Sequence, residues 1–228
     1  MSKSNAAINQ FINQLKASAF FCSMDEASLT TMAERAKQTN YQAGELIFDE
    51  GEPSKGLYWL ESGTIKAVKY SQAGKEQILH FIKPGQTFNE VGAFTTRPNP
   101  ASVVALEEVK AWCIPREAIK ERIYADPGFA QMIIDVLSDR LRHSVMLIED
   151  LSLRPVVSRV ARLILDESDD GTLFRPTWYT QYELASRLGT VADVVQRSLR
   201  KLEADNLIEV ERKQIQILNR PELEKMAA

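Results

Sequence analysis

The stretch that decides the fold is residues 179–218, YTQYELASRLGTVADVVQRSLRKLEADNLIEVERKQIQIL. Thr180 begins it as a candidate helix cap, and Glu183, three residues later, has the spacing of a capping box. The apolar residues that follow at helical spacing are Leu184, Ala185 and Leu188. Gly189 then ends the helix, because glycine accepts the left-handed conformation found after a helix C-terminus.

A second helix is predicted to start at Thr190, and its inward residues are Val194, Val195, Leu199 and Leu202. Ala185 is small, which lets the two helices cross closely. Two short apolar runs, LIEV and IQIL, follow around a polar turn and predict a two-stranded wing. Helix, glycine turn and helix form the unit that places its second helix in the major groove of DNA.

The side chains predicted to contact DNA are Thr180, Gln181, Thr190, Ala192, Asp193, Gln196, Arg197, Arg200 and Lys213. Glutamine pairs with adenine edges and arginine with guanine edges, whereas basic side chains on phosphates fix the register. The alternative is a small helical domain with a solvated basic face. The capping spacing, the glycine turn and the wing occur together, and this combination favours DNA binding.

Residues 128–153 predict one long helix with apolar positions seven residues apart, which is typical of a dimer seam. The predicted interface residues are Ile134, Leu137, Leu141, Ser144, Ile148 and Leu151. The alternative is a helix packed on its own barrel, but about 37 Å of helix exceeds a small barrel. Ser144 is either a polar contact to an effector or a small residue tolerated between helices. Arg154-Pro155 then interrupts the helix.

Upstream, residues 41–115 carry short apolar runs between recurring glycines, which predicts an antiparallel barrel or sandwich. Helical spacing precedes it at residues 5–18 and 25–38, and residues 166–176 are expected to be an acidic loop. The expected domains are an effector-sensing domain at 1–127, the dimerisation helix at 128–153, and a DNA-binding domain at 154–228.

Composition narrows the function classes. The chain has 228 residues and a net charge of −3, without an apolar run long enough for a membrane span, so a cytoplasmic protein with no membrane partner is expected. Two cysteines and two histidines, each isolated in the sequence, predict no metal site. The sequence offers no Ser-His-Asp set, no phosphate-binding P-loop and no suggestive carboxylate pair, so an enzyme is not expected.

Taken together, these parts resemble the CRP/FNR family of bacterial transcription regulators. The resemblance rests on AGELIFDEGEPSKGLYWLESGTIKAV (43–68), PGQTFNEVGAF (84–94), the long helix, and ELASRLGTVADVVQRSLRKLEADNLI (183–208). It implies an α+β fold with an N-terminal cyclic-nucleotide-binding-like antiparallel β-roll, a long dimerisation helix and a C-terminal winged helix-turn-helix. It also implies a homodimer on double-stranded DNA, allosteric control by a small-molecule effector, and RNA polymerase as a partner, with loop 166–176 as one candidate surface.

In family members that bind cyclic AMP, the stretch similar to 88–102 is a phosphate cassette. Here Glu90 and Gly92 match, but Asn89 replaces a glycine and the Arg-Ser pair falls on Pro100 and Ala101. Loss of a buried charge partner costs roughly 3–5 kcal/mol, or two to three orders of magnitude in affinity. Cyclic AMP is therefore not expected to be the effector. The resemblance assigns the effector pocket to Asn89, Glu90, Val91, Gly92, Ala101, Ser102, Leu141, Ser144 and Val145.

Other controls stay open, and the cofactor is left unassigned. An FNR-like iron–sulfur centre needs four cysteines, which this chain lacks. Haem or redox sensing would need His80 or His143 as a ligand, although each is more readily a surface or satisfied histidine. A regulator without an effector is another alternative, and a ligand-binding module without DNA is a weaker one. Ala192 and Asp193 depart from the family's recognition helix, so the target DNA and the sign of regulation are not predicted.

Overall fold

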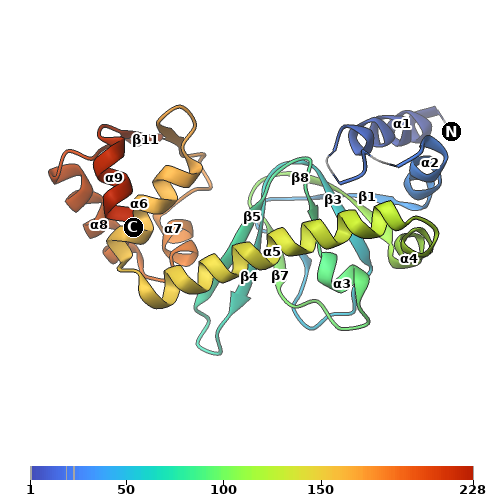
Figure 1. The fold of residues 1–228 in the computed structure, drawn as a ribbon, viewed down its shortest axis with the longest axis horizontal. Coiled ribbons are helices and arrows are strands. Elements are labelled where there is room, and N and C mark those ends of the chain that lie inside the picture. Colours follow the sequence, from blue (N-terminus) through green and yellow to red (C-terminus); the bar gives the residue numbers. More distant parts are fainter. Residues whose placement is uncertain (1, 19, 23, 228) are drawn as a thin grey trace. The chain divides into compact units, whose positions relative to one another are not determined.

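The computed structural model describes residues 2–18, 20–22 and 24–227, which form two compact units (Figure 1). Unit 1 comprises Met1–Lys69 and His80–His143. Unit 2 comprises Tyr70–Leu79 and Ser144–Ala228.

Unit 1 combines helices with a β-roll. Its helices are α1 (Ser2–Ala17), α2 (Glu26–Arg35), α3 (Glu90–Phe94), α4 (Arg116–Ala125) and the first part of α5 (Pro127–Leu153). The strands of the roll are β1 (Lys37–Tyr41), β2 (Leu46–Phe48), β3 (Gly56–Ser62), β4 (Ile65–Tyr70), β5 (Glu76–Ile82), β6 (Thr87–Phe88), β7 (Ser102–Ala105) and β8 (Val109–Pro115); the last residue of β4 and the first four of β5 are grouped with unit 2.

The strands form two sheets, ordered β1-β8-β3-β6 and β2-β7-β4-β5. The pairs whose register is described run antiparallel, with Trp59 opposite Trp112. Gly63 lies between β3 and β4 with φ 80°, and a Cβ there would lie 2.4 Å from the Glu108 carbonyl oxygen. Only glycine meets both constraints at this turn. The predicted antiparallel β-roll is confirmed.

The apolar core of unit 1 joins the helices to the sheet β1-β8-β3-β6. Phe11 and Leu15 lie one turn apart on α1, and the Phe11 ring stacks on Trp112 with centroids 4.3 Å apart. Each large side chain buried in this way contributes about 1.5–3 kcal/mol. The core also includes Phe21, Leu29, Trp59, Ile114, Ile119, Phe129 and Ile133.

Helix α5 starts inside this core. The Asp126 carboxylate accepts the backbone N–H of Gly128 at 2.9 Å and that of Phe129 at 3.3 Å, and Pro127 occupies the first turn. Phe129 is fully buried. The helix has 27 residues, which corresponds to roughly 40 Å. A long helix ending at Leu153, as the sequence predicts, is confirmed.

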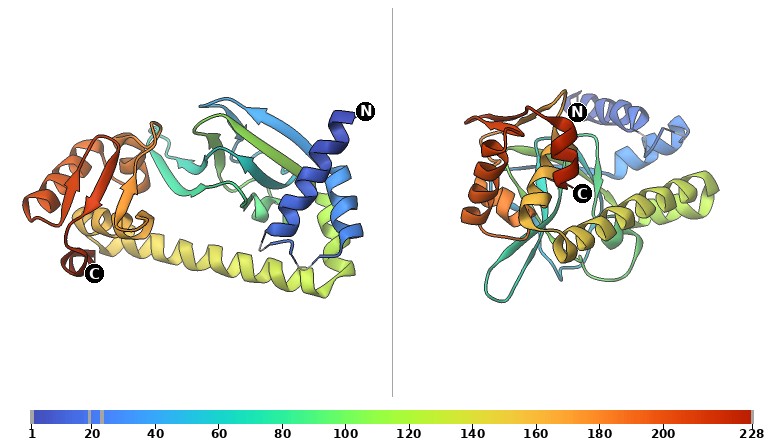
Figure 2. Two further views of the ribbon diagram at one scale, coloured as in Figure 1. Left: turned by 90° about the horizontal axis from the view of Figure 1, so that it is seen from above. Right: turned by 60° about the vertical axis from the view of Figure 1, so that its left-hand side comes forward.

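Unit 2 contains the helices α6 (Val156–Glu167), α7 (Gln181–Arg187), α8 (Ala192–Ala204) and α9 (Arg220–Ala227), and the strands β9 (Thr172–Phe174), β10 (Ile208–Val210) and β11 (Gln214–Ile217). Helix α6 packs against α8 and α9, and Figure 2 shows α9 next to α6. The strands form one antiparallel sheet, ordered β10-β11-β9. The winged helix-turn-helix is thus present, and the predicted α+β fold class is confirmed.

Arg154 lies at the joint between α5 and α6. The Arg154 guanidinium bonds Glu149 at 2.8 Å, Asp150 at 3.0 Å and the Ala227 carbonyl oxygen at 2.5 Å. Pro155 occupies the N-cap position of α6. The arginine therefore ties the end of α5 to the last helix of unit 2.

The predicted bounds of two elements were wrong. The helix predicted over 25–38 ends at Arg35, because residues 37–41 pair with β8 as strand β1. The expected loop 166–176 contains β9, which pairs with β11 and buries Leu173. No helix in the described part of the chain has the length and apolar character needed to cross a membrane.

Candidate nucleic-acid interface and effector site

The helix-turn-helix is built from local bonds of the predicted kind. The Thr180 hydroxyl accepts the Glu183 backbone N–H at 3.3 Å and caps α7. Gly189 follows the helix with φ 65°, and the N–H of Thr190 donates to the Ala185 carbonyl oxygen at 2.9 Å. Ala185 is buried where α7 meets α8.

The second helix starts later than predicted. Its first residue is Ala192 and its N-cap is Val191, whereas the sequence pattern placed the start at Thr190. The backbone N–H of Thr190 is already used to close α7, so this residue still belongs to the turn.

Helix α8 has one buried and one exposed face. Val195, Ser198, Leu199 and Leu202 are buried. Asp193, Arg197 and Arg200 are exposed on the other side. The packing of the apolar face thus determines which side chains α8 offers to a ligand.

Two predicted DNA contacts bond one another. The Gln181 amide on α7 donates to the side-chain oxygen of Gln196 on α8, and both residues are half-buried. This bond orients the Gln196 amide. Sequence spacing gives no sign of it, because the partners lie on different helices.

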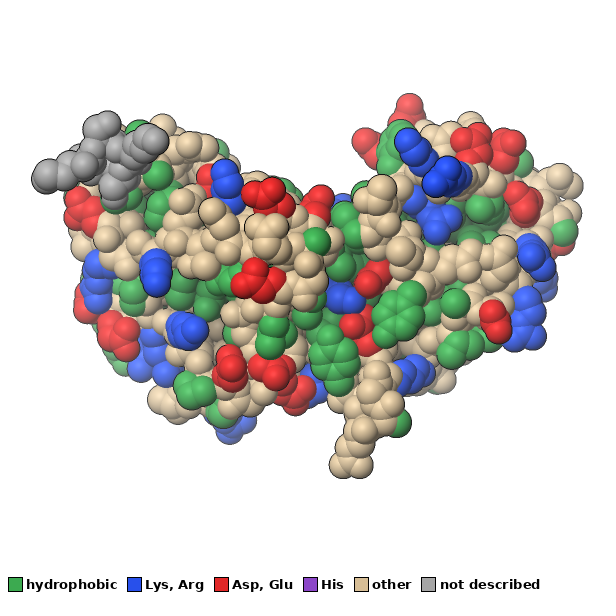
Figure 3. Space-filling view, turned by 180° about the vertical axis from the view of Figure 1, so that it is seen from behind, with side chains coloured by type: hydrophobic (Ala, Val, Ile, Leu, Met, Phe, Trp, Pro, Cys, Tyr) green, Lys and Arg blue, Asp and Glu red, His purple; other side chains and the backbone are tan. Residues whose placement is uncertain are grey.

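The other predicted DNA contacts lie around this pair. Thr180 and Lys213 are exposed, whereas Thr190 and Ala192 are half-buried. Lys213 lies on the turn between β10 and β11, and its carbonyl oxygen accepts the Arg175 N–H at 2.7 Å. In the view of Figure 3, basic and acidic side chains are interspersed on each unit rather than gathered by sign.

The turn before α3 is organised by Asn89. This residue has φ 66°, a left-handed conformation that asparagine tolerates better than most residues. Its side-chain amide donates to Ser54 Oγ at 3.0 Å and to the Gly56 carbonyl oxygen at 3.2 Å. Asn89 therefore adopts the left-handed backbone conformation that the glycine it replaces would adopt.

Glu90 is buried and engaged within the protein. Its carboxylate accepts the Thr87 hydroxyl at 2.8 Å and lies 3.4 Å from the Arg140 guanidinium. Arg140, on α5, also donates to the Thr87 carbonyl oxygen at 3.0 Å. Arg140 is thus bonded to the carboxylate of the turn.

Ser102 is engaged as well. Its hydroxyl donates to the Asp49 carboxylate and accepts the Glu50 N–H at 3.0 Å. Lys69 bonds the Glu50 carboxylate and the Pro100 carbonyl oxygen. These partners come from β4, β7 and the segment after β2, and no sequence motif links them.

Gly92 and the Pro-Asn-Pro segment are linked by packing. Asn99 is 3 % exposed, and its N–H donates to the Glu52 carbonyl oxygen at 2.9 Å. A Cβ at Gly92 would lie 2.5 Å from Asn89 Oδ1 and 2.8 Å from Asn99 Oδ1. The two amide oxygens thus restrict this position to glycine. Of the remaining predicted pocket residues, Ala101 is buried and Val91 is exposed.

The predicted dimer residues on α5 fall into two sets. Ile134, Leu141 and Ile148 are 55 %, 66 % and 64 % exposed, and Val145 is 57 % exposed beside them. Leu137 is half-buried and packs against the core of unit 1, and Leu151 is also half-buried. Ser144 is exposed. The exposed apolar row therefore consists of Ile134, Leu141, Val145 and Ile148.

Cys22 and Cys113 are thiols rather than members of a disulfide. Cys22 is exposed, and burial raises the pKa of the half-buried Cys113 thiol. In the described residues, no group of three or more His, Cys, Asp or Glu side chains is placed to hold a metal ion.

Comparison with known proteins agrees with both units. Residues 38–125 match the cyclic nucleotide-binding domain, and residues 158–226 match the Crp-like helix-turn-helix domain. The CRP-like cAMP-activated global transcriptional regulator of Mycobacterium tuberculosis is 26% identical over 219 residues, covering 93% of this chain and 98% of that protein.

Electron transport regulator A of Shewanella oneidensis is 29% identical over 193 residues, covering 82% of this chain and 76% of that protein. The structure of FixK2 from Bradyrhizobium japonicum has the same fold, with a TM-score of 0.75 at 22% identity, covering 85% of this chain and 98% of that one. The two domain matches, their order along the chain and the winged helix-turn-helix lead to one conclusion: the chain belongs to the CRP/FNR family of DNA-binding transcription regulators, which are not enzymes.

Proposed function

We propose that this regulator is a homodimer that pairs along α5 and binds double-stranded DNA with one α8 from each copy. The observation that carries the proposal is the exposed apolar row of Ile134, Leu141, Val145 and Ile148. Soluble proteins seldom leave a contiguous apolar stripe in water unless a partner covers it.

A second copy suits this row better than an unrelated partner. The residues are spaced by seven, four and three positions along one helix, as in the seam of two paired helices. A two-fold axis lets each copy supply the same row, so every contact is repeated. Leu137 packs on its own unit and lies at the edge of this seam rather than in its centre.

DNA recognition is assigned to the exposed side of α8. Arg197 is exposed near the N-terminal half of the helix, where it can reach base edges. Gln196 is oriented by Gln181 and is the second base-reading candidate. Arg200 and Lys213 are the candidates for phosphate contacts, which set the register.

Cyclic AMP does not suit the α3 turn as an effector. A phosphate needs an available cation and several donors. Here Arg140 is bonded to Glu90, Lys69 is bonded to Glu50, and the Ser102 hydroxyl donates to Asp49. An incoming phosphate would have to break these pairs and approach Asp49 and Glu90. The proposed effector is therefore a ligand other than a cyclic nucleotide.

The same internal bonds favour a second candidate, a regulator that needs no effector in this pocket. The carboxylates and cations of the turn already satisfy one another, so the turn is organised without a ligand. We propose RNA polymerase as the partner protein on promoter DNA.

Gel shifts of genomic fragments test DNA binding. We expect Arg197→Ala to weaken specific retardation, whereas Arg220→Ala, which removes the same charge from exposed α9, preserves it. Calorimetric titration of the wild-type chain with cyclic AMP and cyclic GMP tests the effector. Micromolar binding of either nucleotide would overturn that part of the proposal.

A further inference from the structure

The turn between α7 and α8 is bonded to an arginine from a third helix. The Arg159 guanidinium, on α6, donates from Nη1 to the Leu188 carbonyl oxygen. Leu188 is the C-cap residue of α7, and Gly189 follows it in the turn. The last carbonyls of a helix have no partner within that helix, so Arg159 supplies a donor from outside the helix-turn-helix. These residues all belong to unit 2.

The backbone at Gly189 lies close to the same arginine and to the end of α5. A Cβ at Gly189 would lie 2.5 Å from Leu151 Cδ2 and 3.5 Å from Arg159 Nη1. Leu151, which the sequence pattern placed in the dimer seam, therefore packs against the turn. The turn is thus in contact with side chains from α5 and from α6.

The Arg159 side chain is partly withdrawn from water. The residue is half-buried, and its Nε is buried without a hydrogen-bond partner in the part of the chain that the structure describes. Burial lowers the pKa of the guanidinium, and the negative charge of Asp150 opposes this shift. A guanidinium is planar and rigid, so its bond to the Leu188 carbonyl also fixes a direction.

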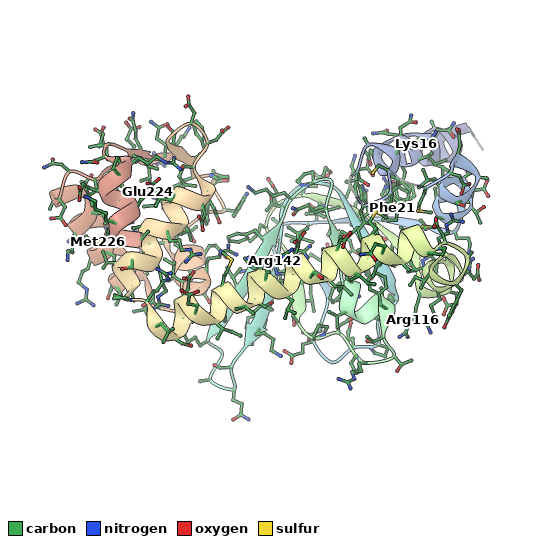
Figure 4. All side chains as sticks on the ribbon, in the orientation of Figure 1. Lys16, Phe21, Arg116, Arg142, Glu224 and Met226 are labelled. Carbon is green, nitrogen blue, oxygen red and sulfur yellow. The ribbon has the colours of Figure 1, made fainter. Side chains whose placement is uncertain are left out.

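Helix α6 is a firm base for this bond. It packs against α8 and against α9, on which Figure 4 labels Glu224 and Met226. Arg159 lies in the first turn of α6, and its N–H donates to the Pro155 carbonyl oxygen at 3.1 Å. Since α8 starts at Ala192, three residues after Gly189, the position of the turn determines where α8 begins.

We propose that Arg159 is a positioning residue for DNA recognition, which caps the end of α7 and thereby fixes the direction in which α8 presents Gln196 and Arg197. The inference rests on the proposed DNA-binding function and adds to it a residue that acts through the turn. Contacts to base edges require accurate placement, whereas phosphate contacts carry no sequence information. Loss of Arg159 should therefore weaken specific binding more than non-specific binding.

The ratio of specific to non-specific affinity separates this role from a merely structural one. The probes are a duplex that the wild-type chain selects from a random pool and a shuffled duplex of the same length. Arg159→Met should weaken binding to the selected duplex by about tenfold or more, as loss of one base contact would. It should weaken binding to the shuffled duplex by less than about threefold, because phosphate contacts dominate there. Fluorescence anisotropy measures both.

Two further substitutions at the same position complete the test. Arg159→Lys keeps a charged donor on a flexible stem and should recover part of the lost specificity. Arg159→Gln removes the charge and shortens the side chain, and it replaces Arg159→Met in case that variant does not fold.

Arg162→Ala is the matched control, because it removes the same charge from the same helix. Arg162 bonds Asp150 at 3.3 Å and Asp166 at 3.7 Å rather than the turn. Its loss should lower the free energy of unfolding in urea but leave the ratio of the two DNA affinities as in the wild type.

The outcomes distinguish this inference from the function on which it rests. A wild-type ratio in Arg159→Met, or the same loss of ratio in Arg162→Ala, would overturn the positioning role. Unfolding of both Arg159→Met and Arg159→Gln would also overturn it, since the arginine would then support the fold as a whole. A wild-type chain that selects no duplex would overturn the proposed DNA binding itself, and this inference with it.

Discussion

Leu141 lies in the middle of the exposed row on α5, and its side chain is the most exposed of the four. Complete burial of a leucine side chain stabilises by about 1.5–3 kcal/mol. Since Leu141 is 66 % exposed, covering it in a dimer recovers about two-thirds of that value, or roughly 1–2 kcal/mol per copy. The two-fold axis repeats the contact, so Leu141→Ala should weaken the dimer by roughly 2–4 kcal/mol, or about 30- to 700-fold in Kd.

Sedimentation equilibrium of wild type and variant measures this difference directly. The control is Tyr124→Ala, because Tyr124 is 88 % exposed but lies on α4, outside the row. If exposed apolar area alone caused association, Tyr124→Ala would have the larger effect. A dimer constant for Leu141→Ala within about twofold of the wild type would refute the assignment of the seam.

The remaining predictions concern unit 2. Arg197→Ala should reduce the binding free energy on specific DNA by about 1–3 kcal/mol and relax the preference at one base pair. Lys213→Ala should weaken binding to all sequences alike and lower the slope of log K against log salt concentration by about one. Fluorescence anisotropy at several salt concentrations distinguishes the two effects. Gly189→Ala should destabilise by roughly 1–2 kcal/mol in urea unfolding, because Gly189 has φ 65° and alanine disfavours that conformation; a destabilisation below about 0.5 kcal/mol would contradict the left-handed turn. Burial beside Glu167 raises the pKa of Tyr179 well above its usual value near 10, so the unfolded state loses this proton first. Stability should therefore fall as pH rises beyond about 10, and less steeply in Tyr179→Phe; equal slopes in urea titrations would count against this cause.

Elements with strong local signals were predictable from the sequence. The capping spacing at Thr180 and the glycine at 189 identify the first helix of the pair, and both the Thr180 cap bond and the left-handed Gly189 are present. The long helix over 127–153 follows from its apolar repeat and from the proline after Arg154. Local chemistry decides these features, so neighbouring residues suffice to predict them.

Features that depend on distant residues were not predictable. The short strand β9 has three residues and is fixed by pairing with β11 rather than by its own pattern. The bonds of Arg140 to Glu90, and of Lys69 to Glu50, join residues far apart in the chain. The contact between the rings of His80 and His143, with centroids 6.1 Å apart, has the same origin, and so does the packing of Leu137 on its own unit.

Selection of binding sites from a random pool of duplex DNA examines α8 and the dimer in one experiment, because a single consensus depends on both. We expect a two-fold symmetric consensus whose half-sites are one helical turn apart, about 10–10.5 base pairs from centre to centre. Enrichment of a single unpaired half-site, or no enrichment at all by the full chain, would contradict it.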